Sequence, residues 1–382
     1  MDELIEMKGL YIYYDLNSQT KESVGIIKKV YAQNKYFSDE FGEKCDLLNL
    51  PLSKNLSRFQ RFFSYLFSSN TFDLSIIENR NYDYVYIRRI TPNCKSVIKV
   101  LKLLRKYNPK CKIVYEIPTY PYDFEHDTFA LKMILFIDKI YRRQLNKYIN
   151  RIVTLTDDKE IFKCKTLKIT NGVDVKNIPI TKKQFFDSNH INLIAVAQFS
   201  FWHGYERVIE GLYEYYKGSG TVDVKLHLVG NGSEIIKYKK MVADYKLENH
   251  VIFHNALYGE KLNEVFDTSD IAICSLACHK KNIYLSSELK SREYLCRGLP
   301  IISSTKIDVI PDDFKYVLRV PEDDTPIDIS KIIEFSQRIY ESSSVGNFES
   351  KEYKVKSEIR KFAEQNCDMK IAMKSVVKYF KE

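Results

Sequence analysis

The sequence predicts an α/β protein with two parallel β-sheets, each covered by helices on both faces. Short, apolar, β-branched runs alternate with amphipathic helical patterns along the chain. This alternation is typical of parallel sheets, because their strands are joined by helical crossovers. The chain has 382 residues, more than one ordinary hydrophobic core accommodates. Residues 176–190, KNIPITKKQFFDSNH, interrupt the alternation, so we expect two domains that divide after residue 177.

The expected strands are apolar runs bounded by polar or turn residues. In chain order they are 9–15, 82–88, 112–118, 151–156, 191–197, 224–230, 250–255, 271–276 and 300–304. Between them, residues 94–107 and 206–218 carry apolar side chains at helical spacing. The end of the chain, 355–382, is also helical in pattern, with apolar residues at Ile359, Phe362, Ile371, Val376, Val377 and Phe380.

Composition and charge narrow the class of protein and of partner. Hydrophobic residues make up 45% and charged residues 29% of the chain, as in soluble globular proteins. The formal net charge of +9 favours an anionic partner: a nucleotide, a phosphorylated lipid, a membrane surface or a nucleic acid. The sequence has no nucleic-acid-binding module, no P-loop and no complete Gly-x-Gly-x-x-Gly. We therefore expect no nucleic acid partner, no kinase and no dinucleotide site.

The N-terminus and the cysteines predict a reduced, cytoplasmic protein. The chain starts MDELIEMKGLYIYYD, with acidic residues where a signal peptide has a basic start, and no run of about 18 apolar residues is present. The eight cysteines are scattered, and Cys274 and Cys278 lack a second pair that would complete a zinc site. No Asp-x-Asp follows a strand. We expect core thiols, no metal and no cofactor.

The stretch SSELKSREYLCRGLPIISS, residues 286–304, carries the strongest functional signal. Ser287 suits an N-cap, and Gly298 and Pro300 stop a helix, so the stretch predicts a helix over 288–297. The helix follows an expected strand, so it begins at the carboxyl edge of a parallel sheet, where ligands bind. Free N–H groups and the helix dipole favour an anion there.

One face of this helix combines charges of both signs. Lys290, Glu293, Tyr294 and Arg297 fall together on a helical wheel. A surface ion pair between Lys290 and Glu293 is one explanation, and in this order it contributes at most about 0.2–0.5 kcal/mol. A sugar-nucleotide explains the pattern better, because Glu293 can accept hydrogen bonds from two ribose hydroxyls while Lys290 neutralises a diphosphate.

The stretch LKSREYLCRGLPIISS resembles the donor-binding signature of the GT-B glycosyltransferases, in particular the large retaining family GT4. Lys290, Glu293, Tyr294, Gly298 and Pro300 fall on that signature. Four other stretches resemble the family in the same chain order: LKITNGVDV, AVAQFSFWHGYERVIEGL, LHLVGNGSE and VIFHNALYGEKLNEVFDTSDIAICSL. Two more, YIRR and VYEIPTYPYDFE, resemble a branch associated with bacterial surface polysaccharide synthesis.

The resemblance implies the GT-B fold, in which two Rossmann-like domains have a cleft between them. Residues 1–177 would bind the acceptor and residues 178–362 the nucleotide-sugar. The last segment, 363–382, would be a helix that crosses back to the N-terminal domain. The sugar donor would be a co-substrate, with UDP-sugar favoured over GDP-sugar.

The resemblance also assigns site residues in the second domain. The expected catalytic residues are Glu293, Lys290 and His203. The expected donor-binding residues are Gly204, Arg207, Gly230, Gly232, Glu288, Leu289 and, from the first domain, Gly25. Alternatives stay open for several of them: Trp202 and His203 can simply pack between loops, and the three glycines outside the His203–Gly204 pair can be ordinary turn residues.

The sequence departs from the family pattern at four positions. Leu285 stands where the family has a second glutamate, eight residues before Glu293. Gln198 and His203 stand where the family has Arg and Lys near the phosphates, and Pro118 stands near a usual histidine. We expect Glu288 to take part of the missing glutamate's role, and Lys290 and Arg207 to supply the missing positive charge.

Acceptor-binding residues are expected at the ends of two strands of the first domain. Glu116, Thr119, Tyr120 and Tyr122 follow one strand and can orient acceptor hydroxyls, although a rigid proline-containing loop explains them equally. Arg88 ends another strand and can bind an acceptor phosphate or serve as an ordinary surface arginine.

Two stretches of the first domain alternate basic and large apolar residues. LSRFQRFFSYLF, 56–67, contains Arg58, Phe59, Arg61, Phe62 and Phe63, and LKMILFIDKIYRRQLNKYINR covers 131–151. Such helices can lie in a membrane interface, or pack on their own domain. The first reading predicts peripheral contact with the anionic inner face of the plasma membrane.

Together these observations predict a retaining, metal-independent glycosyltransferase that uses a nucleotide-sugar and a glycan or lipid-linked acceptor in surface polysaccharide synthesis. Two alternatives remain at this point. One is a UDP-sugar 2-epimerase of the same fold, and the other is a non-catalytic partner protein that binds a sugar-nucleotide.

Overall fold

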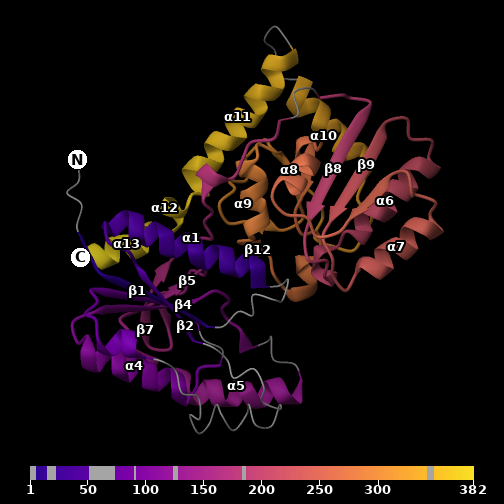
Figure 1. Cartoon of the computed structure of the whole chain (residues 1–382). Coiled ribbons are helices and arrows are strands. Elements are labelled where there is room, and N and C mark those ends of the chain that lie inside the picture. The colour runs from indigo at the N-terminus through magenta and orange to yellow at the C-terminus, as the bar shows by residue number, and fades with distance from the viewer. Residues whose placement is uncertain are drawn as a thin grey trace. The chain divides into compact units, whose positions relative to one another are not determined.

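The chain forms two compact units in the computed structural model (Figure 1). The structure describes residues 6–14, 23–50, 74–89, 92–123, 128–182, 186–341 and 348–382. The first unit comprises Met1–Thr170 and Ala372–Glu382, and the second comprises Asn171–Ile371.

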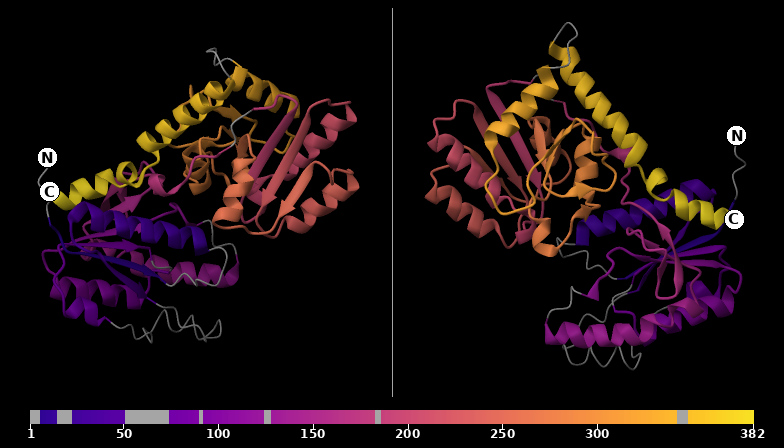
Figure 2. Two further views of the ribbon diagram at one scale, coloured as in Figure 1. Left: turned by 45° about the horizontal axis from the view of Figure 1, so that its top comes forward. Right: turned by 180° about the vertical axis from the view of Figure 1, so that it is seen from behind.

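The first unit is built on a sheet that is parallel except at one edge. Its strand order is β2 (Asp46–Leu50), β1 (Gly9–Tyr14), β3 (Tyr84–Arg88), β4 (Lys112–Ile117), β5 (Arg151–Thr154), β7 (Cys164–Lys168) and β6 (Glu160–Ile161). Only β6 pairs antiparallel, with β7. Helices α4 (Lys95–Tyr107) and α5 (Phe129–Arg142) cover one face, and α1 (Ser23–Phe41) covers the other (Figures 1 and 2). The short helix α3 (Ser75–Glu78) precedes β3.

The C-terminal helix α13 (Lys374–Lys381) completes the α1 side of this unit. Its Phe380 lies against Tyr84 of β3, with ring centroids 4.6 Å apart. Lys112 of β4 donates to the carbonyls of Tyr379 and Phe380 at 3.1 and 3.0 Å. These contacts hold the C-terminal helix α13 against the sheet of the first unit.

The second unit has a fully parallel sheet with the order of a doubly wound fold. The strands lie as β10 (Val251–His254), β9 (Asp223–Val229), β8 (His190–Val196), β11 (Ile271–Ile273), β13 (Ile301–Ser303) and β15 (Val317–Arg319). Numbered along the chain this is 3-2-1-4-5-6, so the direction of winding reverses between β8 and β11. In such sheets, ligands bind outside the carboxyl ends of the strands at this switch point.

Helices cover both faces of the second sheet. Helices α6 (Glu206–Lys217) and α7 (Ile235–Asp244) cover one face, and α8 (Glu260–Asp267) and α9 (Leu289–Cys296) cover the other (Figure 1). Helix α10 (Ile329–Glu341) precedes the long α11 (Phe348–Asn366), and α12 (Met369–Ala372) leads to the unit boundary. A two-stranded pair, β12 (Leu285–Ser286) with β14 (Lys306–Ile307), lies outside the main sheet.

All nine expected strands and the two parallel sheets are confirmed, and β2, β7 and β15 were not predicted. The unit boundaries differ from the expected 177/178 and 362/363. Asn171 already belongs to the second unit, because its backbone N–H donates to Ser287 Oγ at 3.1 Å and its side chain donates to the Ser287 carbonyl at 2.5 Å. At the other end, Arg360 of α11 donates to the carbonyls of Val175 and Cys296, which keeps α11 on the second unit.

Two further features of the structure concern the cysteines and the hydrophobicity of the helices. All eight cysteines are buried and unpaired, as predicted. None of the helices in the described part of the chain combines the length and the apolar character that crossing a bilayer requires.

Candidate functional site

The loop after β8 is held between the loops after its two neighbouring strands. On the β9 side, Phe199 N–H donates to the Asn231 carbonyl at 2.7 Å. On the β11 side, the N–H groups of Leu276 and Ala277 donate to the carbonyls of His203 and Trp202 at 2.8 and 3.2 Å. The topological switch point is therefore covered by a backbone-anchored loop, residues 197–205.

Glycines make this close approach possible. Gly204 has φ +65°, and a Cβ there would lie 2.7 Å from the Ala277 Cβ. Gly232 has φ +153°, and a Cβ there would lie 2.1 Å from the Phe199 carbonyl oxygen. Gly230 belongs to the same turn after β9. The observed contacts give these three expected donor-binding glycines a packing role, and their contact with a donor stays a prediction.

Aromatic rings connect two lysines above this loop. Lys281, from the short turn Cys278–Lys281 after β11, lies over the Trp202 ring with its Nζ 4.6 Å from the centroid. Trp202 contacts His203 (centroids 5.6 Å apart), and His203 stacks on Tyr205 at 5.6 Å with 10° between the planes. Lys290 Nζ lies 5.6 Å from the Tyr205 ring centroid and 3.2 Å from its hydroxyl. We call these five residues the aromatic ladder.

His203 is the buried imidazole of the aromatic ladder, close to both of its lysines. Burial, together with the positive charges of Lys290 and Lys281, lowers the pKa of His203 to about 2, so the imidazole is neutral at physiological pH. The Ser200 N–H donates to its Nδ1 at 3.0 Å. A neutral imidazole that accepts at Nδ1 carries its proton on Nε2. His203 therefore offers a hydrogen-bond donor without a positive charge.

The N-terminus of α9 completes the site. Glu288, at the N-cap position, accepts a hydrogen bond from Ser275 Oγ at 2.8 Å and lies 3.5 Å from Lys290 Nζ. Lys290 has a side chain only 14% exposed. Its Nζ contacts the Tyr205 hydroxyl beside the switch-point loop, and its contact with a diphosphate stays a prediction. Leu289 is the first helical residue beside it.

Glu293 lies one turn further along α9 and is engaged with Arg297. The Glu293 carboxylate accepts from Arg297 Nη2 at 3.0 Å and keeps 34% of its side chain exposed. Arg297 also donates to Asn263 Oδ1 at 3.0 Å and stacks 3.9 Å over the Phe266 ring. The alternative explanation, a Lys290–Glu293 surface pair, does not hold, since each side chain has a different partner.

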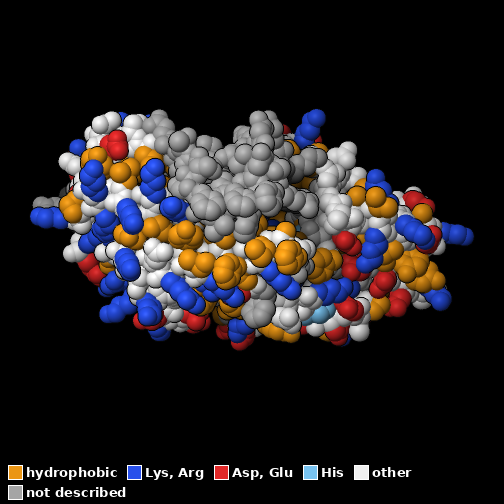
Figure 3. All heavy atoms as spheres, turned by 90° about the horizontal axis from the view of Figure 1, so that it is seen from below, with side chains coloured by type: hydrophobic (Ala, Val, Ile, Leu, Met, Phe, Trp, Pro, Cys, Tyr) orange, Lys and Arg blue, Asp and Glu red, His pale blue; other side chains and the backbone are white. Residues whose placement is uncertain are grey.

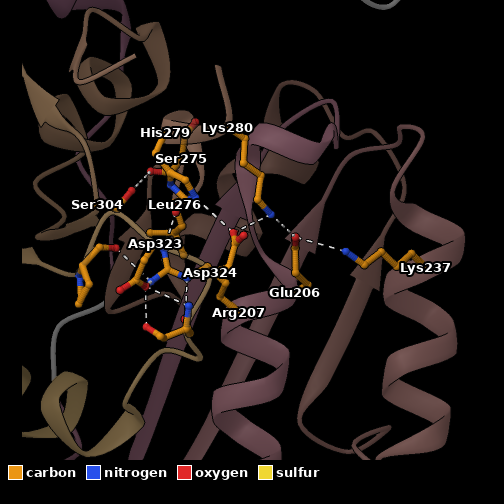
Figure 4. A network of polar contacts seen from close by, with 12 residues as sticks. Glu206, Arg207, Lys237, Ser275, Leu276, His279, Lys280, Ser304, Asp323 and Asp324 are labelled. Atoms are coloured by element: carbon orange, nitrogen blue, oxygen red, sulfur yellow. Dashed lines mark hydrogen bonds and ion pairs between the residues drawn. The ribbon is translucent and has the colours of Figure 1, made fainter. Parts of the chain in front are cut away.

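Arg207 lies in a different network from the expected one (Figure 4). Its side chain is 1% exposed and donates to the carbonyls of Thr325 (2.7 Å), Leu276 and Pro321 (3.1 Å), with Asp323 3.3 Å away. Each of the three guanidinium nitrogens therefore has an acceptor. The geometry supports a role in tying the 321–325 loop to the β11 loop, and a direct contact between Arg207 and a donor stays a prediction.

Lys280, next to Lys281, belongs to the same network (Figure 4). Its Nζ lies 3.3 Å from Glu206 and 2.9 Å from Asp324, and Glu206 also pairs with Lys237 at 3.3 Å. Of the two adjacent lysines, Lys280 is neutralised by carboxylates while Lys281 lies over an aromatic ring.

In the first unit, the expected acceptor residues Glu116 and Arg88 form a buried network. The Glu116 carboxylate accepts from Lys29 Nζ at 2.7 Å, from the Tyr86 hydroxyl at 2.8 Å and from Arg88 Nη1 at 3.0 Å. Burial alone would raise the pKa of Glu116, but Lys29, Arg88 and Tyr86 lower it to about 2. Glu116 has 0% exposure, so its observed contacts are internal.

The other expected acceptor residues differ in exposure. Tyr122 is buried, and its hydroxyl donates to Asp138 Oδ2 at 2.7 Å. Tyr120 is half-buried against Phe162, and Thr119 is exposed at the end of β4. Gly25 lies in the first turn of α1. The cluster from Arg58 to Phe63 lies outside the described residues.

The structure adds site residues that the sequence did not assign. Lys281 and Tyr205 complete the aromatic ladder, and Ser275 binds Glu288. The triplet His279-Lys280-Lys281 in the loop that follows β11 was a signal for a cationic loop at the carboxyl edge. Of the family departures, Leu285 is 50% exposed in β12 and Gln198 is exposed in the β8 loop. Within the described ranges, no three His, Cys, Asp or Glu side chains gather to hold a metal.

Comparison with known proteins identifies the family that the second unit resembles. Residues 177–312 match the family model of glycosyl transferases group 1. This range contains the aromatic ladder, α9 and the loops of the switch point. A search of curated protein sequences gave no match.

Solved structures show that the chain has the GT-B fold. A glycosyltransferase from Rickettsia africae is 14% identical with a TM-score of 0.61, over 98% of both chains. HepE from Anabaena, in complex with UDP and glucose, is 13% identical with a TM-score of 0.60, over 98% of this chain and 100% of that one. Sucrose-phosphate synthase from Thermosynechococcus elongatus is 12% identical with a TM-score of 0.60, over 98% of both chains.

Proposed function

We propose that this protein is a retaining glycosyltransferase that transfers a sugar from a nucleotide-sugar, with UDP-sugar favoured, to a glycan or lipid-linked acceptor. One observation carries the proposal. The segment 177–312 matches the group 1 glycosyl transferases and also contains the aromatic ladder, whose lysines Lys281 and Lys290 lie at the switch point. The structure of HepE with UDP-glucose, which shares the fold at 13% identity, supports the choice of UDP. Synthesis of a surface polysaccharide is the proposed setting.

The proposed chemistry is departure of the nucleoside diphosphate, helped by fixed positive charge and N–H groups. Lys290 and Lys281 neutralise the diphosphate, and His203 Nε2 donates a hydrogen bond as charge develops. The first N–H groups of α9 add their dipole. Glu293 leaves Arg297 and accepts hydrogen bonds from the ribose hydroxyls. This set of residues works without a metal or a cofactor.

The acceptor is proposed to bind the first unit, with Thr119 and Tyr120 as the accessible members of the expected set. A lipid-linked acceptor places the protein at the inner face of the plasma membrane as a peripheral protein. The internal contacts of Glu116, Arg88 and Tyr122 support a positioning role for these three in the acceptor region.

The test is donor turnover by the purified protein across a panel of UDP- and GDP-sugars, with and without glycan and lipid-linked acceptors. Acceptor-dependent release of nucleoside diphosphate with an α-configured donor yielding an α-linked product supports a retaining transferase. Turnover of the sugar without any acceptor indicates an epimerase. Binding without turnover under all conditions indicates a partner protein. Chelator should leave the transfer rate unchanged, and a rate lost with EDTA and restored by Mg²⁺ contradicts metal independence.

Two substitutions test the assigned donor residues. Lys290→Ala and Glu293→Ala should each lower kcat/KM for the donor by about ten- to a hundredfold, because each removes a hydrogen bond to a charged group. Lys261→Ala and Glu264→Ala, which change exposed charges on neighbouring α8, are the matched controls and should leave kcat/KM unchanged. If either site variant has the kinetics of the wild type, the role proposed for that residue is wrong.

A further inference from the structure

The outer face of α4 is basic along its whole length. Lys95, Lys99, Lys102 and Lys106 are exposed and recur at helical spacing. The helix contains no Asp or Glu. Its opposite face packs into the core of the first unit through Val97, Ile98, Val100, Leu101 and Leu104. The lysines therefore form an uninterrupted stripe of one sign of charge.

Helix α5 exposes large apolar side chains in a similar stripe. Phe129 is 81% exposed, Phe136 60% and Ile140 42%, and they are seven and four residues apart. Each has a basic residue three positions later, Lys132, Lys139 and Arg143, and all three are exposed. Leu135 and Ile137 on the other side of the helix are buried. The exposed apolar stripe is thus separate from the apolar face that packs into the core of the first unit.

Acidic residues are nearly absent from the described helices α4 and α5. The one acidic residue of α5, Asp138, is 1% exposed and is bound by Asn93 and Tyr122. Asp123, just before α5, pairs with Arg142 at 2.6 Å and lies 3.3 Å from Lys139. The described residues of both helices therefore present lysines and arginine to solvent without a free carboxylate between them.

The two helices cover the same face of the first sheet (Figures 1 and 2), so their outer sides form one surface. We define the α4–α5 face as the exposed basic residues of α4 and α5 with Phe129, Phe136 and Ile140. The space-filling view from this side shows apolar and basic side chains next to one another (Figure 3).

The combination of charge and exposed rings selects one kind of occupant. An amphipathic helix with aromatic rings beside lysines is suited to the plane of an anionic bilayer, where rings enter the acyl boundary and ammonium groups meet headgroups. A nucleic acid backbone would use the lysines but leave the Phe rings in water. A second copy of the same face would bring like charges together, which costs free energy.

We infer that the α4–α5 face docks on an anionic lipid bilayer. Phe129, Phe136 and Ile140 insert into the interface, and the lysines of α4 bind lipid phosphates. The inference rests on the membrane contact included in the proposed function. Its test measures lipid binding alone, so it fails separately from sugar transfer.

The experiment is cosedimentation of the full chain with phosphatidylcholine vesicles that contain or lack phosphatidylglycerol. The wild type should bind only the anionic vesicles, and binding should weaken as salt rises. Phe129→Ser with Phe136→Ser should lower partitioning by at least about tenfold, since two rings no longer leave water. Lys99→Gln, Lys102→Gln and Lys106→Gln should each lower it roughly fivefold at low salt.

A matched control lies in the second unit. Ile236 on α7 is 78% exposed and has basic neighbours, so Ile236→Ser with Lys239→Gln removes the same chemistry elsewhere and should leave binding unchanged. A Phe136→Trp variant reports insertion independently. The wild type has one Trp, Trp202, and the added emission should be quenched by brominated acyl chains.

Several outcomes would overturn the inference. They are absence of wild-type binding to anionic vesicles at low salt, undiminished binding by the Phe129/Phe136 variant, and equal loss in the α7 control. A dimer in sedimentation velocity without lipid, abolished by Phe136→Ser, would assign the face to a second copy. If the double serine variant fails to fold, by circular dichroism, the glutamine variants and the Phe136→Trp quenching decide the question.

Discussion

His203 and Tyr205 stack face to face, with centroids 5.6 Å apart and ring planes 10° apart. The stack places the imidazole between two ammonium groups, Lys290 beyond Tyr205 and Lys281 beyond Trp202. Position 203 therefore holds a neutral ring that is flanked by two cations from other elements. The positive charge at this site comes from the β11 loop and from α9.

The first prediction is that His203 does not titrate in the physiological range. Burial and the two lysines lower its pKa to about 2, so the imidazole is neutral in the fold and protonates near pH 6.5 when unfolded. The His203 Cε1–H signal, assigned by its loss in His203→Gln, should not move between pH 5 and 8 in NMR spectra. A midpoint within that range would contradict the geometry.

The same shift has a consequence for stability, with the sign fixed by linkage. A depressed pKa in the folded state contributes stability above the unfolded pKa, and this contribution is lost as pH falls. His203→Gln should therefore flatten the loss of unfolding free energy between about pH 6.5 and 5, by roughly 1.4 kcal/mol per pH unit. Urea unfolding of the two proteins at several pH values measures the difference.

The second prediction compares two adjacent lysines. Lys281→Ala should weaken binding of a nucleoside diphosphate by roughly tenfold, because it removes a cation that carboxylates do not neutralise. Lys280→Ala is the matched control: it lies in the same turn, but Glu206 and Asp324 hold its charge, so the dissociation constant should change by less than about twofold. Isothermal titration with UDP compares them. Equal effects, or the reverse order, would move the diphosphate to the Lys280 side of the turn.

The third prediction concerns Arg207. Arg207→Met should lower the free energy of unfolding by about 3 kcal/mol, since three carbonyls lose a charged donor. Arg207→Lys should restore little, because an ammonium group cannot reproduce the fork of guanidinium donors. Arg338→Met, at an exposed arginine of α10, should cost less than about 0.5 kcal/mol. Normal stability with impaired donor binding would return Arg207 to a donor role.

The sequence predicted the parts of the fold that local pattern determines. Strands such as 191–197 and 224–230 are long apolar runs, and both parallel sheets follow from their alternation with helices. β2 and β15 were missed because Asp46–Leu50 and Val317–Arg319 are short and mix polar with apolar residues. Their strand conformation depends on pairing with β1 and β13, which a single sequence does not specify.

Local sequence predicts some residues of the candidate site and not others. Lys290 and Glu288 were predictable, because the helix start and stop signals place the first turn of this helix at the carboxyl edge, although the N-cap is Glu288 and not the predicted Ser287. Two of the carbonyls that Arg207 binds come from 321–325, more than a hundred residues away, and the third belongs to Leu276. Its engagement was therefore invisible in the local sequence. Glu293 was placed on the correct helix, but it pairs with Arg297 rather than with Lys290. Lys290 instead contacts Tyr205 and Glu288, and the local sequence does not specify these contacts.

The last prediction tests the buried network of the first unit by pH. Glu116 has its pKa lowered to about 2 although it is fully buried, because Lys29, Arg88 and Tyr86 all bind its carboxylate. Glu116→Gln removes the negative charge that Lys29 and Arg88 both bind, so it should cost about 3–5 kcal/mol at neutral pH. A depressed carboxyl pKa contributes stability above the unfolded value near 4.3, and that contribution is lost as pH falls toward 2.

The difference between wild type and Glu116→Gln should therefore be constant above about pH 5 and should narrow steadily below pH 4.3. Urea unfolding at closely spaced pH values measures it. Asp312→Asn is the control: Asp312 pairs with Lys306 at the surface, with a side chain 80% exposed, so its loss should be small at every pH. A Glu116→Gln difference that stays constant down to pH 3 would mean that the pKa of Glu116 is the same in the folded and unfolded states, and that Lys29 and Arg88 do not lower it.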